Sequence, residues 1–271
     1  MLPSAPAPVA SSRGPYARFA DQIRQLFAWF SSFKEYRRER IEAWNRFIAV
    51  DGPRFVMPAI VDFGFSLRDV NHTTVPIDQQ VQLMGELSRR QPLGRLLHGY
   101  VPFNPVRFAR DPIDATAAID NAVQNQGFVG VKLYPPMGYQ ASGNSKISMR
   151  YFGYLNIANL GERIDSALNW VYDYCLENDL TILVHSAPSN SPHANPYDGW
   201  VVGTEDWSRR PNPDFWSTVL ADRPGLRVLF GHFGGAYRVS RNRAWVDKIV
   251  DLMMAYPNVY GDFSDYDLVL D

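Results

Sequence analysis

The chain has 271 residues and a formal net charge of −1, from 27 basic and 28 acidic side chains. This balance provides no electrostatic surface for nucleic acid, which we exclude as a partner. With 46% hydrophobic and 20% charged residues, the composition is typical of a globular protein with a full core. The sequence contains no run of about 18 apolar residues, so it predicts no membrane span. We therefore expect the partner to be a small molecule.

The N-terminal part differs from the rest. Residues 1–15 have neither the basic start nor the apolar centre of a signal peptide and predict a disordered tail. Residues 16–52 repeat apolar side chains at intervals of three and four, which predicts amphipathic helices packed on the following domain, residues 53–271. The alternative is a helix lying on a membrane surface. The single cysteine, Cys175, allows no internal disulfide, so we expect a cytoplasmic protein.

Beyond residue 53, strand-like and helix-like segments alternate. The predicted strands are Val56–Phe65, Arg95–Phe103, Phe128–Tyr134, Leu180–His185, Leu226–His232 and Asn258–Phe263. The predicted helices are Asp78–Arg90, Pro112–Gln126, Glu162–Asn178, Pro213–Arg223 and Arg243–Tyr256. Regular alternation indicates an α/β fold with a parallel sheet and right-handed crossovers.

A TIM-barrel-like (β/α) fold is the best interpretation of this alternation. None of the turns carries the glycine pattern of a nucleotide-binding doubly wound sheet. A barrel needs eight strands and we recognise six. We expect one missing strand between Phe65 and Phe128 and the other beyond Asp271. The chain is then a fragment, or another body such as a second copy covers the open edges.

Two of the apolar strands end in histidine, at His185 and His232. Because the carboxyl ends of parallel strands meet at one rim, both imidazoles are expected to point into one pocket, where they could share a metal ion or a substrate. Lys132 lies near the end of another strand, on the face opposite Val131 and Leu133. A buried lysine is costly unless it reaches a polar mouth or a partner, so we treat it as a candidate catalytic residue. The alternative is that each histidine is a satisfied core residue.

The order of four segments resembles the amidohydrolase superfamily, specifically the amidohydrolase-2 branch of metal-dependent TIM-barrel hydrolases and decarboxylases. The segments are Gly130-Val-Lys-Leu-Tyr-Pro-Pro136, Leu183-Val-His-Ser186, Leu229-Phe-Gly-His-Phe-Gly-Gly235 and Asn258-Val-Tyr-Gly-Asp-Phe-Ser264. The resemblance covers roughly residues 54–265. It implies that His185 binds a divalent metal, zinc or manganese, and that His232 is a second ligand or the acid/base. It also implies that Lys132 lies at the site, and we add Tyr134 as a substrate contact.

The sequence departs from this family at the first strand and at the last. Members carry an H-x-H pair on strand one, but Gly64 and Ser66 occupy these positions here. The aspartate of the last barrel strand is absent. His72, in a turn, and His98, early in a strand, do not replace the pair. Since catalytic zinc normally has three protein ligands, two histidines alone are expected to bind metal weakly or not at all.

The activity implied by the resemblance is hydrolysis of a C–N or C–O bond, or nonoxidative decarboxylation, by a partial or altered copy. The loop from Pro188 to Pro213 is long enough to form a lid, and its Trp207 and Arg209 are candidate substrate contacts. Arg209 and Arg210 could equally be a solvated pair. Two alternatives stay open: a Schiff-base lyase with Lys132 as nucleophile, and a catalytically inactive barrel that serves as a binding module.

Overall fold

The computed structural model describes residues 56–65, 75–89, 97–188, 209–235 and 243–264. The chain divides into two compact units, Met1–Arg54 and Phe55–Asp271, and all described residues belong to the second. The predicted tail and the predicted N-terminal helices lie outside the described residues. No helix in the described part is long and apolar enough to cross a membrane.

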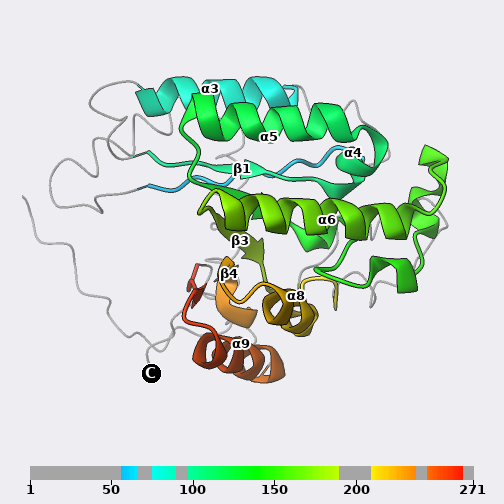
Figure 1. Ribbon diagram of the computed structural model, residues 1–271, viewed down its shortest axis with the longest axis vertical. Helices are drawn as coiled ribbons and strands as arrows, with labels where there is room; N and C mark the ends of the chain where they lie inside the picture. The colour runs from blue at the N-terminus through cyan, green and yellow to red at the C-terminus, as the bar shows by residue number, and fades with distance from the viewer. Residues whose placement is uncertain (1–55, 66–74, 90–96, 189–208, 236–242, 265–271) are drawn as a thin grey trace, which may run out of the picture. The chain divides into compact units, whose positions relative to one another are not determined.

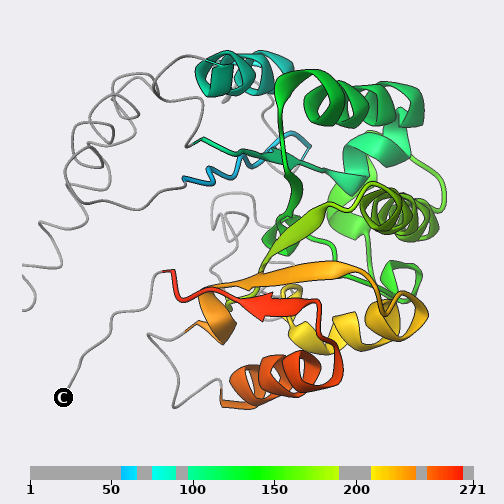
Figure 2. The same ribbon diagram turned by 60° about the vertical axis from the view of Figure 1, so that its left-hand side comes forward.

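Five parallel strands form the sheet, in the same order as in the chain. They are β1 (Tyr100–Pro102), β2 (Gly130–Leu133), β3 (Thr181–His185), β4 (Arg227–Gly231) and β5 (Val259–Gly261). Helices connect successive strands, as Figures 1 and 2 show. The predicted α/β class with a parallel sheet is confirmed. Within the described residues the sheet is open rather than closed into a barrel.

The helices lie along one side of this sheet (Figure 2). They are α3 (Ile77–Arg89), α4 (Pro105–Arg110), α5 (Pro112–Gln126), α6 (Leu160–Glu177), α8 (Trp216–Asp222) and α9 (Arg243–Ala255). Short 3-10 helices cover Pro135–Met137, Asn144–Lys146, Arg150–Leu155, Pro213–Phe215 and His232–Gly234. The five predicted helices are therefore present, with ends shifted by up to three residues, and α4 is additional.

Helix α4 escaped prediction because it is only six residues long and has no full apolar repeat. Its start is nevertheless encoded locally. The Asn104 side chain accepts hydrogen bonds from the backbone N–H groups of Val106 and Arg107, and Pro105 occupies the first helical position. Asp111 ends α4 and caps α5 by accepting from the Asp114 N–H. The two caps turn the chain sharply after β1.

The strand predicted at Val56–Phe65 is not a regular strand. Only two isolated parallel bridges occur there, Val56 with Leu97 and Ala59 with Tyr100. Pro58, which has no N–H to donate, interrupts the ladder of hydrogen bonds. The expected additional strand between residues 65 and 128 is not found in the described part of that stretch, where β1 is the one regular strand.

The two faces of the sheet carry different residues. Val131, Val184 and Phe230 are completely buried on the face covered by helices. Strand alternation places Lys132 and His185 on the opposite face, since each is one residue away from these positions. Charged and titratable side chains thus gather on the face that the helices leave uncovered, next to the carboxyl ends of the strands.

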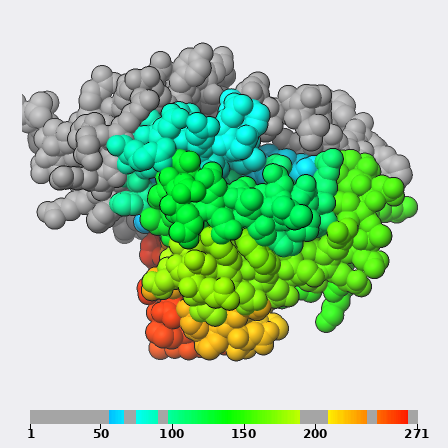
Figure 3. Space-filling view, turned by 45° about the horizontal axis from the view of Figure 1, so that its top comes forward, coloured from blue at the N-terminus to red at the C-terminus, as the bar shows by residue number. Residues whose placement is uncertain are grey.

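Apolar packing holds the helices on the sheet. Figure 3 shows α3, α5 and α6 as adjacent layers on the outer surface. The rings of Phe103, Phe108 and Trp170 pack together with centroids 5.4 to 5.9 Å apart, which joins α4 to α6. Cys175 on α6 is fully buried, and burial raises the pKa of its thiol. It is therefore a core residue, as expected for a lone helical cysteine.

Candidate functional site

The rim at the ends of β3 and β4 brings the two histidines together. His185 is paired in register with Gly231, so His232 follows directly beyond the neighbouring strand. The two imidazole rings are in contact, with centroids 4.5 Å apart and planes inclined by 62°. The predicted convergence on one small region is therefore present in the fold.

His185 is buried, with 8% of its surface exposed. Its Nε2 lies 3.2 Å from the carbonyl oxygen of Ala187. Because a carbonyl oxygen can only accept, Nε2 carries the hydrogen and Nδ1 keeps the lone pair. Burial lowers the pKa of His185 well below its ordinary value, and His232 and Lys132 lower it further. The ring is consequently neutral at pH 7.

His232 is held in an unusual backbone conformation. Its φ is +66° and that of Phe233 is +39°, in the left-handed region that residues with a side chain rarely adopt. The Gly234 N–H donates to the Ser186 carbonyl oxygen at 2.8 Å, which ties this turn to the end of β3. Gly234 also has a positive φ, which glycine adopts without strain. The turn redirects the His232 side chain where β4 ends.

Lys132 and Tyr134 extend the site across β2. Only 7% of Lys132 is exposed, and its Nζ lies 6.0 Å from the centroid of the Tyr134 ring. That ring contacts His185 edge-on, with centroids 4.9 Å apart. Burial lowers the pKa of Lys132 to about 8, although the negative charge of Asp262 works in the opposite direction. The amine is therefore mostly charged at pH 7, with a small neutral fraction.

Asp262 follows β5 and connects to His232. Its Oδ1 accepts from the backbone N–H groups of His232 and Ser264, each at 3.0 Å, and from the Ser264 hydroxyl. Burial alone would raise the pKa of Asp262, but the hydrogen bonds from Ser264 and His232 lower it below its ordinary value. The carboxylate is ionised at neutral pH. Asp262 and Ser264 both lie in the fourth segment of the family resemblance, which assigns neither a role, and the only sequence signal of Ser264 is its spacing of two from Asp262.

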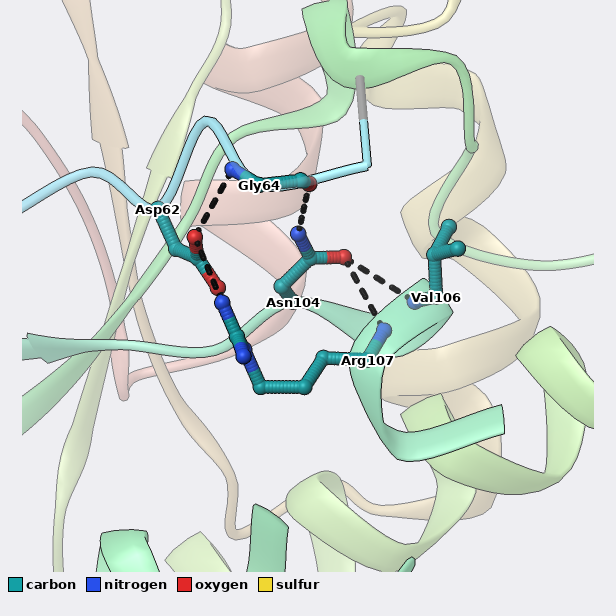
Figure 4. Close-up of polar contacts among 5 residues, drawn as sticks. All are labelled: Asp62, Gly64, Asn104, Val106 and Arg107. Atoms are coloured by element: carbon teal, nitrogen blue, oxygen red, sulfur yellow. Dashed lines mark hydrogen bonds and ion pairs between the residues drawn. The ribbon is translucent and has the colours of Figure 1, made fainter. Parts of the chain in front are cut away.

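The segment Asp62–Gly64, called the first-strand end because it lies near the end of the predicted first strand, has a different set of contacts (Figure 4). Arg107 makes two bonds to the Asp62 carboxylate, Nε to Oδ2 at 2.8 Å and Nη2 to Oδ1 at 3.1 Å. The Gly64 N–H donates to Asp62 Oδ1 at 2.8 Å, and the Asn104 side-chain amide donates to the Gly64 carbonyl oxygen at 2.8 Å. These contacts satisfy the carboxylate and fasten the first-strand end to the start of α4.

Gly64 is the residue that the sequence predicts at the first position of the H-x-H pair. A Cβ added there would lie 2.8 Å from Arg107 Nη2 and 2.9 Å from Asp62 Oδ1, closer than such contacts allow. The ion pair therefore occupies the space that a side chain at position 64 requires. The second position, Ser66, lies outside the described residues.

The described residues do not fit a resident metal ion. Among them, no group of three histidine, cysteine, aspartate or glutamate side chains is placed to hold one. His185 and His232 supply two imidazoles, fewer than the three protein ligands of a catalytic zinc site. The groups available for chemistry among the described residues are therefore the side chains themselves.

The remaining predicted substrate contacts have mixed outcomes. Trp207 lies outside the described residues. Arg209 is exposed, and its carbonyl oxygen accepts from the Asn212 N–H at 3.0 Å. The interpretation of Arg209 and Arg210 as a solvated pair is wrong for Arg210, which is 6% exposed and lies 3.3 Å from Gln140 Oε1. Its neighbour in sequence turns to solvent while Arg210 packs inward.

Comparison with solved structures gives distant similarities. An uncharacterized TIM-barrel protein from Bordetella bronchiseptica is 17% identical, with a TM-score of 0.39 over 69% of this chain and 50% of its own. The 5-carboxyvanillate decarboxylase of Novosphingobium aromaticivorans, in a complex with manganese and 4-hydroxy-3-methoxy-5-nitrobenzoic acid, is 16% identical with a TM-score of 0.43, over 83% of this chain and 57% of its own. A mutant of that enzyme is 15% identical with a TM-score of 0.44, over 82% of this chain and 55% of its own. The chain thus spans between 50 and 57% of these proteins.

These TM-scores are too low to transfer the roles of individual residues. No curated protein matches the chain. The sequence profile of one family, described as amidohydrolase, matches residues 98–267, which is more than half of the chain. This match includes the ends of all five strands and the residues that carried the resemblance in the sequence. The chain belongs to the amidohydrolase family.

Proposed function

We propose that this chain is an amidohydrolase-family enzyme that hydrolyses a C–N or C–O bond of a small molecule at the rim of β2 to β5. The observation that supports this most directly is the contact between the His185 and His232 rings, 4.5 Å apart at the ends of adjacent strands. Lys132 lies on the same face of the sheet, and its charge acts on His185. The site therefore offers proton acceptors and a positive charge within one small region.

In this proposal His232 is the general base and acid, and Lys132 stabilises negative charge. A neutral His232 with its hydrogen on Nδ1 accepts a proton from water at Nε2 while the water oxygen bonds to the substrate carbonyl carbon. The Lys132 ammonium stabilises the oxygen that becomes negative. His232 then returns the proton to the leaving nitrogen or oxygen as the C–N or C–O bond breaks. His185, neutral and in ring contact, helps to position His232 and the substrate.

Whether the proposed enzyme uses zinc or manganese is tested separately. Since the described residues supply two imidazole ligands, an ion held by this chain would need further ligands from the rest of it. Metal analysis of the purified chain, followed by assays with and without chelator, decides the matter. A bound stoichiometric ion with chelator-sensitive activity supports metal-dependent hydrolysis.

Variants of the histidines test the proposal as a whole. With p-nitrophenyl acetate and p-nitroacetanilide as probes, we expect His232→Ala to lower kcat/KM by ~100-fold or more, the usual contribution of a general acid/base. His185→Ala is expected to lower it as well. His98→Ala is the matched control, because His98 lies below the rim and its backbone N–H pairs with the Val56 carbonyl oxygen. Equal rates in all three variants and the wild type would contradict the proposal.

Related assays test two other activities, decarboxylation and Schiff-base chemistry. Nonoxidative decarboxylation is measured as release of carbon dioxide from a panel of small carboxylic acids. A Schiff-base lyase is favoured by the burial of Lys132, which leaves 7% of the residue exposed and lowers the pKa of its amine to about 8. Borohydride trapping with a carbonyl substrate, followed by mass analysis of the Lys132 peptide, tests it. The absence of reaction with every probe, together with the absence of bound metal, would favour the binding-module alternative.

The location and assembly of the proposed enzyme stay predictions. The single cysteine, which is buried, favours a reducing compartment such as the cytoplasm. The open sheet leaves strand edges that a second copy could cover. Cell fractionation and size-exclusion chromatography with light scattering test the two statements.

A further inference from the structure

A hydrogen-bonded chain connects the Asp262 carboxylate, the Ser264 hydroxyl and the His232 ring. Ser264 Oγ lies 3.1 Å from His232 Nδ1 and also contacts Asp262 Oδ1. The Ser264 carbonyl oxygen lies 3.2 Å from the same Nδ1. Two oxygen atoms of Ser264 therefore lie within hydrogen-bond distance of one ring nitrogen of His232.

The chemistry of these groups fixes the position of each hydrogen. A carbonyl oxygen only accepts, so the contact with the Ser264 carbonyl requires a hydrogen on His232 Nδ1. The Ser264 hydroxyl has one hydrogen, and the ionised Asp262 carboxylate has none to give. The hydroxyl therefore donates to Asp262 and accepts from Nδ1. Both contacts lead independently to the same tautomer.

Asp262 holds the backbone of His232 as well. Its Oδ1 accepts from the His232 N–H at 3.0 Å, at a residue whose φ is +66°. A backbone in this region is retained only when its surroundings hold it there. One carboxylate therefore acts on His232 twice, through the main chain and through Ser264.

We infer that Asp262 and Ser264 are positioning residues for His232: they fix its imidazole hydrogen on Nδ1 and so direct the lone pair of Nε2 toward the reaction. This inference deepens the proposed function, in which His232 accepts a proton at Nε2. His185 has the opposite arrangement, with the hydrogen on Nε2 facing the Ala187 carbonyl oxygen. The two adjacent rings therefore present different nitrogens for chemistry.

The tautomers can be measured without any substrate. The chain has five histidines, which can be labelled with nitrogen-15 and assigned with single His→Gln variants. Spectra at about pH 8, above the ordinary histidine pKa of ~6.5, report which ring nitrogen carries the hydrogen. For the full-length wild type we expect one His232 tautomer, with the hydrogen on Nδ1, and the opposite tautomer for His185.

Variants of the two positioning residues test the connection. In Ser264→Ala the hydroxyl is lost and the carbonyl remains, so a second population of His232 with its hydrogen on Nε2 is expected. Asp262→Asn is expected to increase that population, because the amide can donate to Ser264 and reverse the chain. Ser264→Thr keeps the hydroxyl and should keep the wild-type spectrum. Ser166→Ala is the matched control, since Ser166 donates to the Glu162 carbonyl oxygen on the exposed side of α6.

Three results would overturn the inference. One is a wild-type His232 with its hydrogen on Nε2, and another is a mixture of both tautomers in the wild type. The third is a wild-type spectrum in Ser264→Ala, and this variant carries the test alone if Asp262→Asn does not fold. A wild-type Nδ1 tautomer without any hydrolysis would instead support the positioning and contradict the proposed function.

Discussion

The first-strand end and the ends of β3 to β5 use polar side chains in opposite ways. At the first-strand end, the oxygens of Asp62 accept hydrogen bonds from Arg107 and from the Gly64 N–H. We call this group of Asp62, Gly64 and Arg107 the clamp. At β3 and β4, one nitrogen of each imidazole lies 3.2 Å from a carbonyl oxygen. Asp62 is thus held by a side chain of opposite charge, whereas the two histidine rings contact backbone oxygens and each other.

Breaking the clamp should have the largest effect on stability. Arg107→Ala leaves the Asp62 side chain, which is 7% exposed, without its two charged hydrogen bonds. Removing one partner of a largely buried ion pair costs about 3–5 kcal/mol, and the partial exposure of Arg107 places the expected loss near the lower end. Urea unfolding followed by circular dichroism measures it.

The matched control is an exposed ion pair of the same geometry. Arg243 Nε lies 2.8 Å from Asp247 Oδ1, the same separation as between Arg107 Nε and Asp62 Oδ2. Because both partners on α9 are more than half exposed, Arg243→Ala should cost about 0.5 kcal/mol or less. Similar losses in both variants would show that the first-strand pair is only another surface contact.

The sequence predicted the contact between the two histidines but not the pairing of Asp62 with Arg107. His185, His232 and Lys132 were found because a polar residue at the end of an apolar strand is a local pattern. The clamp was not found, because Asp62 and Arg107 are 45 residues apart and their pairing depends on how α4 follows β1. That Gly64 stands in a histidine position of the family stays a prediction, and only the fold shows what fills the space beside it.

The fold itself was predictable where local signals agree. The five regular strands and five of the helices follow from apolar runs, turn residues and 3.6-residue periodicity. The failures have local causes as well: Pro58 interrupts the first strand, and α4 is too short to show a period. The role of Ser264 was missed because it arises from a turn after β5, where sequence spacing does not reveal the direction of a hydroxyl.

A second experiment tests the charge of Lys132, which lies on the same face of the sheet as His185. Burial lowers the pKa of Lys132 from 10.5 to about 8, so folding at pH 7 brings a charged amine into surroundings that stabilise its charge less than water does. Lys132→Met should therefore stabilise the fold by about 3 kcal/mol at pH 7. Thermal and urea unfolding of both proteins at several pH values measure the difference.

The pH dependence has a definite sign. Between about pH 8 and 10.5 the unfolded wild-type chain binds more protons at Lys132 than the folded one, so wild-type stability rises with pH. The advantage of Lys132→Met should shrink over this range. Lys248→Met on α9, where the amine is 29% exposed and 3.9 Å from Asp214, serves as the control. A constant advantage across the range would contradict a lowered pKa for Lys132.

The smallest expected effect comes from Gly64→Ala, which tests whether the clamp excludes a side chain. The new Cβ would lie 2.8 Å from Arg107 Nη2 and 2.9 Å from Asp62 Oδ1, so one or both side chains must move. We expect a loss of about 1–2 kcal/mol, within the usual cost of overpacking. Gly153→Ala is the control, since a Cβ there would meet nothing within 4 Å.

A double-mutant cycle identifies the cause. In the Arg107→Ala background the contact with the guanidinium is gone, and Gly64→Ala should then cost less than half as much as in the wild type. An undiminished cost would mean that Asp62 or the backbone, rather than the ion pair, excludes the side chain. The same background then permits Gly64→His, which shows whether a third imidazole at the first strand brings metal binding to a rim that already carries two.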